Sequence, residues 1–238
     1  MGPNMRAKTE LRNDPRQYDR LAADWWKPGG AFAALHWLAR ARAELIPPAR
    51  GGSPILLDIG CGGGLLAPHL DGYRHLGIDL SEPSLRLAAG HGVAPVRGDA
   101  VALPLRDHAV DVAVAGELFE HVADLPGVIA EIARVLRPGG LLVFDTINDT
   151  LWSRISLVLI GERIPGGPPP LIHDPSLFVS PTRLFDLLGD HGFRVRIRGL
   201  RPSVVDYAAF LLGRDRLVRM VPTRSVASVY QGVGRKAG

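Results

Sequence analysis

The sequence ILLDIGCGGG, which occupies residues 55–64, decides the fold. Its first five residues form a short, mostly apolar run of the kind found in buried parallel strands. The glycines that follow allow a tight turn and a close approach of the backbone to a ligand, because no Cβ intervenes. A strand followed by such a turn is typical of a doubly wound α/β sheet, in which ligands bind at the carboxyl ends of the strands.

The segments that follow alternate between apolar runs and amphipathic stretches. We expect strands over residues 73–79, 93–96, 110–115 and 141–146, and helices over residues 65–70, 82–89 and 125–136. Strands that alternate with helices predict a parallel, doubly wound sheet. A helix over residues 181–191, a strand over 193–199 and a last strand over 226–233 complete the pattern.

The remaining segments define the domain organisation. Residues 1–16 are predicted to be a polar tail, and residues 17–238 a single domain that begins with helices within residues 17–48. Residues 148–179 interrupt the alternation with an apolar, helix-like stretch and a proline- and glycine-rich loop. We interpret this insertion as a lid over a site or as a surface loop.

The composition excludes several classes of protein. With 238 residues, 46% of them hydrophobic, the chain can bury one large core. A net charge of +4 without helix-turn-helix, zinc-finger or RNP-type patterns does not indicate nucleic-acid binding. One cysteine cannot form an internal disulfide, the N-terminus lacks a signal peptide's apolar region, and no apolar run reaches the roughly 18 residues of a membrane span. We expect a cytoplasmic protein; the sequence does not reveal its oligomeric state.

Two acidic residues lie where ligand contacts are expected. Asp79 ends the second strand, about twenty residues after the glycine loop, where its carboxylate can accept from both ribose hydroxyls. Asp99 follows the third strand and is either an acceptor for an adenine amino group or a turn residue. The G-x-G-x-G spacing departs from the G-x-G-x-x-G of dinucleotide sites, which bind a pyrophosphate. Asp58, Gly60 and Gly62, with the two acids, are therefore candidate contacts for S-adenosylmethionine, which has no phosphate.

A second group of polar residues follows the fourth expected strand. Glu117, Glu120 and His121 are spaced three and four apart, so on a helical turn they share one face. Two carboxylates and an imidazole suit a divalent ion such as Mg²⁺, Mn²⁺ or Zn²⁺. In the alternative, His121 acts alone as a general base. In the third interpretation, the glutamates lie on a solvated turn and His121 packs structurally.

These motifs resemble those of the class I S-adenosylmethionine-dependent methyltransferases and, more narrowly, of the ubiquinone-biosynthesis O-methyltransferase family. The resemblance covers about residues 18–193. It rests on Trp25-Trp26, on the runs LLDIGCGGGLLA, GIDLSEPSL, ELFEHV, LRPGG and DTIN, and on His173-Asp174. The glycine loop is common to the whole superfamily, whereas the double tryptophan and ELFEHV are more specific.

The resemblance implies roles for particular positions. It implies that Arg42, Gly60, Asp79 and Gly116 contact the cofactor. It implies that Glu117, Glu120 and His121 bind a metal ion. The fold implied is a mostly parallel, seven-stranded sheet with its last strand antiparallel. The loop over residues 165–170 and the chain from residue 201 onward depart from the family pattern, and both regions are expected to border the acceptor.

The resemblance implies an O-methyltransferase that acts on a phenolic or catechol ring, with a polyprenylated quinone precursor as one candidate and a secondary-metabolite ring as another. A nicotinamide-dependent oxidoreductase and a non-catalytic cofactor-binding partner are the alternatives from other classes. His36 and His173 are secondary candidates for substrate contact. The apolar residues 151–160 and the arginines over residues 194–224 have two interpretations: peripheral contact with the inner face of a membrane, or closure over the site and a solvated strand face.

Overall fold

Within residues 12–27 and 29–238, which the computed structural model of the chain describes, eight strands form one mixed sheet in the order β3-β2-β1-β4-β5-β8-β6-β7. The strands are β1 (Ile55–Ile59), β2 (Arg74–Asp79), β3 (Ala94–Arg97), β4 (Val110–Gly116), β5 (Leu136–Ile147), β6 (Phe193–Pro202), β7 (Met220–Thr223) and β8 (Val229–Lys236). The first five pair in parallel, and β8 runs antiparallel to both β5 and β6. The predicted α/β fold is confirmed.

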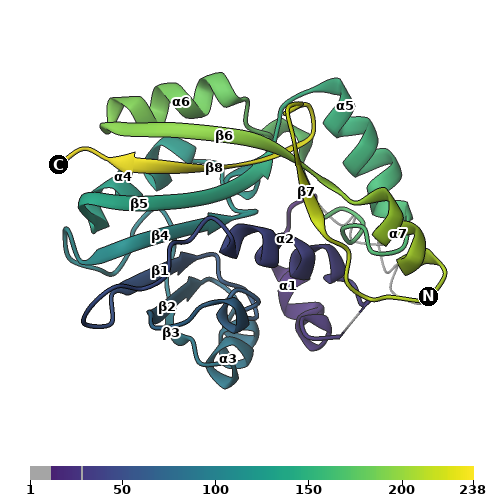
Figure 1. Ribbon diagram of the computed structural model, residues 1–238, viewed down its shortest axis with the longest axis horizontal. Helices are drawn as coiled ribbons and strands as arrows, with labels where there is room; N and C mark the ends of the chain where they lie inside the picture. The colour runs from purple at the N-terminus through teal and green to yellow at the C-terminus, as the bar shows by residue number, and fades with distance from the viewer. Residues whose placement is uncertain (1–11, 28) are drawn as a thin grey trace, which may run out of the picture.

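The helices lie on both faces of the sheet and at the carboxyl ends of its parallel strands (Figure 1). They are α1 (Arg16–Arg20), α2 (Ala33–Ala43), α3 (Glu82–Gly90), α4 (Leu125–Val135), α5 (Leu151–Ser153), α6 (Pro181–Asp190) and α7 (Val204–Leu211). A π-helical segment, Arg154–Ile160, continues α5. Single 3₁₀ turns occur at Ala22–Asp24, Ala67–His69, Phe119–His121, Gly161–Arg163 and Pro175–Leu177.

N-cap side chains fix the first residue of several helices. The Ser81 hydroxyl accepts a hydrogen bond from the Ser84 N–H at the start of α3, and Ser180 accepts one from Arg183 at the start of α6. Asp124 does the same for α4. Each of these helices has proline in its first turn, where the missing N–H costs no hydrogen bond.

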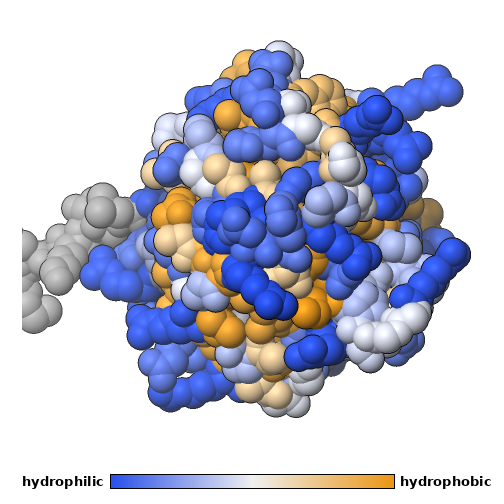
Figure 2. All heavy atoms as spheres, turned by 90° about the vertical axis from the view of Figure 1, so that its left-hand side faces the viewer, coloured by the Kyte–Doolittle hydropathy of each residue, from blue (hydrophilic) through white to orange (hydrophobic). Residues whose placement is uncertain are grey.

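The sheet buries a core on each face because apolar side chains of its central strands point to both faces. Leu57 and Ile59 of β1 pack with α4 and α6, while Leu56 packs with residues such as Ile46 on the opposite face. The alternation follows from the two-residue period of a strand. Figure 2 shows the end of the molecule that carries the C-terminus, where hydrophilic residues dominate.

Several details differ from the sequence expectations. The sheet has eight strands rather than seven, because β7 adds an edge strand, and the last strand covers Val229–Lys236 rather than residues 226–233. The helix expected over residues 65–70 is a single 3₁₀ turn, Ala67–His69. Helix α7 was not expected. The polar tail predicted for residues 1–16 lies outside the described residues as far as residue 11.

Candidate active site

A cavity of about 590 Å³ lies at the carboxyl ends of β1, β2 and β4. Helices α1 and α2, the insertion and α7 gather at the same end of the sheet (Figure 1). The residues predicted for the site line this cavity, apart from the fully buried Glu120: Arg42, Asp58, Gly60, Gly62, Asp79, Asp99, Gly116, Glu117 and His121. The fold therefore brings the predicted cofactor contacts and His121 to one space.

The glycine loop is clamped by the double tryptophan. Gly60 and Gly62 have φ of +71° and +50°, which explains why glycine occupies both positions. The Trp25 ring packs so closely on Gly62 that a Cβ there would overlap it. Trp25 Nε1 donates a 2.9 Å hydrogen bond to Ser84 Oγ, and Trp26 Nε1 donates one of 2.9 Å to the Gly63 carbonyl. The two tryptophans thus hold the loop against α3.

The Asp79 carboxylate connects the loop to the end of β2. Its Oδ2 accepts a 2.8 Å hydrogen bond from the Gly62 N–H, and its Oδ1 accepts one of 2.8 Å from the Ser81 N–H. Burial raises the pKa of this carboxyl group, while the two N–H donors oppose that shift. Asp99 accepts a 3.2 Å bond from the Val101 N–H, as a turn residue does, and it also lines the cavity.

Arg42 reaches the cavity but is held by an acid. Its Nε and Nη2 donate to Asp145 Oδ2 and Oδ1 at 2.6 and 2.7 Å, and both side chains are buried. The guanidinium fills the space that a Cβ at Gly116 would take. Asp145 Oδ1 also accepts a 3.1 Å bond from the Glu117 N–H. This pair fixes the start of the segment that follows β4, and Asp145 was not among the predicted site residues.

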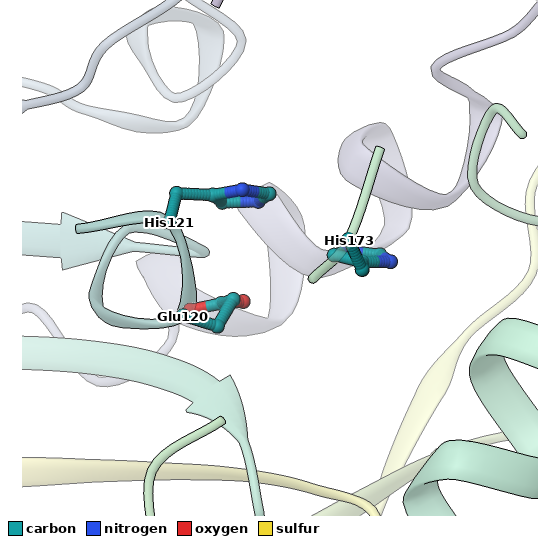
Figure 3. Close-up of side chains that lie close together, drawn as sticks. All are labelled: Glu120, His121 and His173. Carbon is teal, nitrogen blue, oxygen red and sulfur yellow. The ribbon is translucent and has the colours of Figure 1, made fainter. Parts of the chain in front are cut away.

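The segment after β4 brings together a group of possible ligand atoms. Glu117 has a left-handed φ of +50°, so the helical face predicted for Glu117, Glu120 and His121 is broken at its first member. Among the described residues, the ligand atoms that lie within 4.8 Å of one another belong to Glu120, His121 and His173. Figure 3 shows Glu120 and His121 on one turn, with His173 on a separate segment beside them. His173 comes from the insertion.

The polar atoms of this group are only partly satisfied. Glu120 Oε2 accepts a 2.7 Å bond from Thr146 Oγ1, but Glu120 Oε1 and His173 Nδ1 are buried without a hydrogen-bond partner. The His121 and His173 rings stack at a centroid separation of 5.3 Å. The group is named the EHH cluster below. Unsatisfied buried acceptors of this kind fit a cation, since carboxylate oxygen and imidazole nitrogen are both metal ligands.

Burial governs the protonation states at the cluster. It raises the pKa of Glu120 to about 7 and that of Glu117 well above its usual range, with the mutual repulsion of the two carboxylates adding to the shift of Glu117. It lowers the pKa of His121 to about 4 and that of His173 well below its usual value. At neutral pH both imidazoles are therefore uncharged, and their lone pairs are available.

The raised carboxyl pKa values predict how stability depends on pH. An unfolded glutamate ionises near pH 4.5, whereas folded Glu120 holds its proton until about pH 7. Between these two pH values the free energy of unfolding falls by about 1.4 kcal/mol for each pH unit. The stability that is fully present below pH 4.5 is therefore lost as the pH rises to 7. We expect Glu120→Gln to raise the melting temperature of the cation-free protein at pH 7.5 and to flatten its decline from pH 5. Glu82→Gln at the exposed start of α3 is the control; indistinguishable curves for the two variants would contradict the assignment.

The secondary histidine candidates fall in different places. His173 lines the cavity, whereas His36 is not among its lining residues and donates through Nε2 to the Trp25 carbonyl at 2.7 Å. Asn13 and Tyr18, which sequence reasoning did not select, also line the cavity and contact His121. Neither belongs to a motif, and both lie more than a hundred residues before it, so spacing gave no signal.

The chain is similar in sequence to known methyltransferases. The model of a methyltransferase domain family matches residues 57–144. The chain is 32% identical over 194 residues to the ubiquinone biosynthesis O-methyltransferase of Idiomarina loihiensis, covering 75% of this chain and 80% of that one. It is 31% identical over 201 residues to the enzyme of the same name from Parvibaculum lavamentivorans, covering 76% and 79%.

Solved structures share the fold. An S-adenosylmethionine-dependent methyltransferase from Thermotoga maritima superimposes with a TM-score of 0.66 at 18% identity, covering 93% of this chain and 97% of that one. One from Aquifex aeolicus gives 0.58 at 19% identity, covering 93% and 97%. At such identities the likeness concerns the architecture.

Proposed function

Because the chain belongs to the S-adenosylmethionine-dependent methyltransferases, in the family of the ubiquinone biosynthesis O-methyltransferases, we propose that it methylates a hydroxyl group on an aromatic ring. The observation that carries the proposal is that one cavity holds both the glycine loop with Asp79 and the imidazole of His121. A nucleoside-binding wall and a proton acceptor in the same space are what methyl transfer to a phenol requires.

The cofactor contacts lie at the ends of β1, β2 and β3. S-adenosylmethionine supplies a methyl group carried on a sulfonium. Asp79 accepts from the ribose hydroxyls, since each carboxylate oxygen has lone pairs beyond those used by Gly62 and Ser81. Asp99 accepts from the adenine amino group, and Gly60 and Gly62 allow close backbone approach. Arg42, Asp58 and Gly116 shape the wall between the loop and β4, with Arg42 held by Asp145.

On the acceptor side, His121 accepts the proton that the phenolic hydroxyl loses. Its ring is uncharged at neutral pH because burial lowers its pKa, so it is able to accept a proton. The apolar walls from Leu157, Ile147 and Met220 exclude water and favour an aromatic acceptor over a small polar one. A prenyl tail on the ring finds the same apolar surface, whereas a small secondary-metabolite ring needs less of it.

A divalent cation is the second part of the acceptor proposal. Glu120, His121 and His173 offer one carboxylate and two imidazoles, and Glu117 is the further acid that the family pattern places nearby. This donor set suits Mn²⁺ or Zn²⁺ better than Mg²⁺, which prefers oxygen ligands. A cation at the EHH cluster would lower the pKa of a bound phenol. Removal of a proton by His121 alone remains the competing route.

A methyl-transfer assay tests the function. Transfer of tritiated methyl to a panel of phenols and catechols of graded tail length, with and without chelator, is expected to show turnover of at least one catechol. Thermal stabilisation by S-adenosylhomocysteine but not by NADH is expected alongside it. Binding without turnover on every acceptor would favour a non-catalytic partner, and stabilisation by NADH alone would favour an oxidoreductase.

We also propose peripheral contact with a membrane through the insertion and α7. Exposed apolar side chains occur in the insertion, in α7 and at the residue that follows α7: Leu151, Trp152, Leu159, Ile160, Ile164, Val204, Val205, Leu211 and Leu212. Tyr207 Oη donates a 2.9 Å bond to the Pro165 carbonyl, which joins α7 to the insertion loop. Exposed apolar residues beside a cavity mouth are typical of interfacial segments. In the described chain, no helix is both long and apolar enough to cross a bilayer.

Liposome flotation tests this contact. We expect the protein to float with vesicles that contain anionic lipid, and the double substitution Leu159→Ser and Ile160→Ser to reduce the bound fraction several-fold. Phe185→Ser removes an exposed apolar residue of α6 and should leave flotation unchanged. Absence of binding to every vesicle, or an equal loss in both variants, would end the proposal.

A further inference from the structure

Asn13 makes two hydrogen bonds to His121, a residue 108 positions away in the chain. Its Nδ2 donates to the His121 main-chain carbonyl at 2.9 Å. Its Oδ1 lies 2.6 Å from Nδ1 of the His121 ring. The Asn13 amide thus forms hydrogen bonds with both the backbone and the ring of the proposed proton acceptor.

The first of these bonds determines the second. A carbonyl oxygen can only accept, so the amide must present its NH₂ group to the His121 carbonyl and its oxygen to the ring. The amide oxygen carries no hydrogen, so the short contact requires that Nδ1 of the ring carries the proton. In an uncharged imidazole the other nitrogen, Nε2, then has the free lone pair.

That nitrogen lies beside the Tyr18 hydroxyl. Nε2 is 3.4 Å from the Tyr18 hydroxyl, and both Tyr18 and His121 line the cavity. The Tyr18 ring meets the His121 ring edge-on at 6.1 Å between centroids, which limits rotation of the imidazole. An acceptor hydroxyl that replaced the weak Tyr18 contact would meet Nε2 as a proton acceptor.

The backbone conformation of Asn13 and contacts of the neighbouring chain hold this residue beside His121. Its φ is +56°, a left-handed conformation that asparagine adopts more readily than most residues. Its N–H donates a 3.0 Å bond to the Leu171 carbonyl. The preceding Arg12 is paired with the buried carboxylate of Glu162 at 2.9 Å and donates to the His173 carbonyl at 2.9 Å. Three contacts to the insertion therefore hold the amide against His121.

The geometry points to Asn13 as a positioning residue that keeps His121 in the Nδ1–H tautomer and so presents Nε2 to the acceptor. This inference rests on the proposed role of His121. Both routes of the proposed function use that tautomer, because a general base and a cation each require a ring nitrogen with an available lone pair, and Nδ1 is already paired with Asn13. A metal-liganding histidine commonly donates its other ring N–H to a carboxylate, a backbone carbonyl or water, and the Asn13 amide oxygen is the corresponding acceptor here.

Two substitutions separate positioning from support of the fold. Asn13→Gly keeps the left-handed backbone but removes the amide. Asn13→Asp keeps an acceptor for Nδ1–H and loses the donor to the His121 carbonyl. Nitrogen-15 NMR of histidine-labelled protein reports the tautomer, with His121→Gln identifying the His121 signals, and steady-state kinetics give kcat and KM separately.

We expect the wild-type protein and Asn13→Asp to show protonated Nδ1, and Asn13→Gly to show a mixture with protonated Nε2. The kcat of Asn13→Gly should fall at least about 10-fold, Asn13→Asp should retain clearly more, and S-adenosylhomocysteine affinity should change less than about 2-fold. An unprotonated Nδ1 in the wild-type protein, an unchanged tautomer in Asn13→Gly, or equal kcat losses in both variants would overturn the inference. The NMR result stands without substrate, so failure to methylate any phenol would refute the proposed function and not the tautomer.

Discussion

Replacing Asp79 by alanine is expected to raise the dissociation constant for S-adenosylhomocysteine by about 100-fold or more. Its carboxylate orders the glycine loop through Gly62 and Ser81, and we assign the ribose hydroxyls to the same group. Hydrogen bonds to a charged group contribute about 1.5–3 kcal/mol each, so two lost bonds to the ribose correspond to about 150- to 20,000-fold in affinity. Isothermal titration calorimetry measures the change.

Matched variants separate this effect from general damage. Asp71→Ala removes an exposed acid just before β2 and should leave the affinity unchanged. Asp79→Asn keeps one oxygen acceptor and should give an intermediate affinity. Circular dichroism should show that Asp79→Ala is folded, since the carboxylate is a partly desolvated group whose raised pKa already opposes folding at neutral pH. Affinity within a few-fold of the wild-type value would refute the assignment of the cavity wall.

The elements that were predicted well from the sequence are those whose pattern of apolar residues matches their burial in the fold. The strands β1 and β4 are mostly buried on both faces, so apolar residues predominate in them, and their limits are within one residue of the expectation. Helix α4 has a strong apolar face and a capping Asp124, and it too was predicted closely. In these segments, local pattern and tertiary packing favour the same structure.

The elements that were missed lack such a pattern. Helix α7 reads Val-Val-Asp-Tyr-Ala-Ala-Phe-Leu, which is apolar on almost all sides and leaves Val204 and Val205 exposed, so no period identifies a helix. Strand β7 has four residues and contains Pro222, which restricts it to a sheet edge. The helix expected over residues 65–70 is limited by Pro68, and a single 3₁₀ turn forms instead.

Sequence spacing accounts for the placement of the proposed cofactor contacts better than for that of the proposed acceptor contacts. Asp79 and the glycine loop come from adjacent strand ends, where parallel topology alone brings them together. The EHH cluster includes His173, which only the path of the insertion brings to Glu120, while the left-handed backbone at Glu117 turns that residue out of the expected face. Asn13 is likewise placed by bonds to the insertion. Contacts of this range have no signature in the spacing of residues.

His121→Ala should give the complementary result to Asp79→Ala. We expect kcat for methyl transfer to fall about 100- to 10,000-fold, the range for loss of a positioned general base, while S-adenosylhomocysteine affinity stays within about 2-fold. The imidazole bonds to Asn13 and Tyr18 and stacks on His173, none of which belongs to the glycine loop, so we expect removal of the ring to leave the assigned ribose contact in place. Single-turnover kinetics with saturating cofactor measure the chemical step.

The control is His191→Ala, which removes an exposed histidine after α6 and should leave both quantities unchanged. If a cation carries the chemistry, added Mn²⁺ at high concentration should restore part of the His121→Ala activity, because Glu120 and His173 remain as ligands. If His121 acts alone as the base, the metal should have no effect and activity should recover with rising pH, as the phenol ionises without help. Equal losses of cofactor affinity in Asp79→Ala and His121→Ala would show that the two walls of the cavity do not have separate roles, and the proposed mechanism would fail with them.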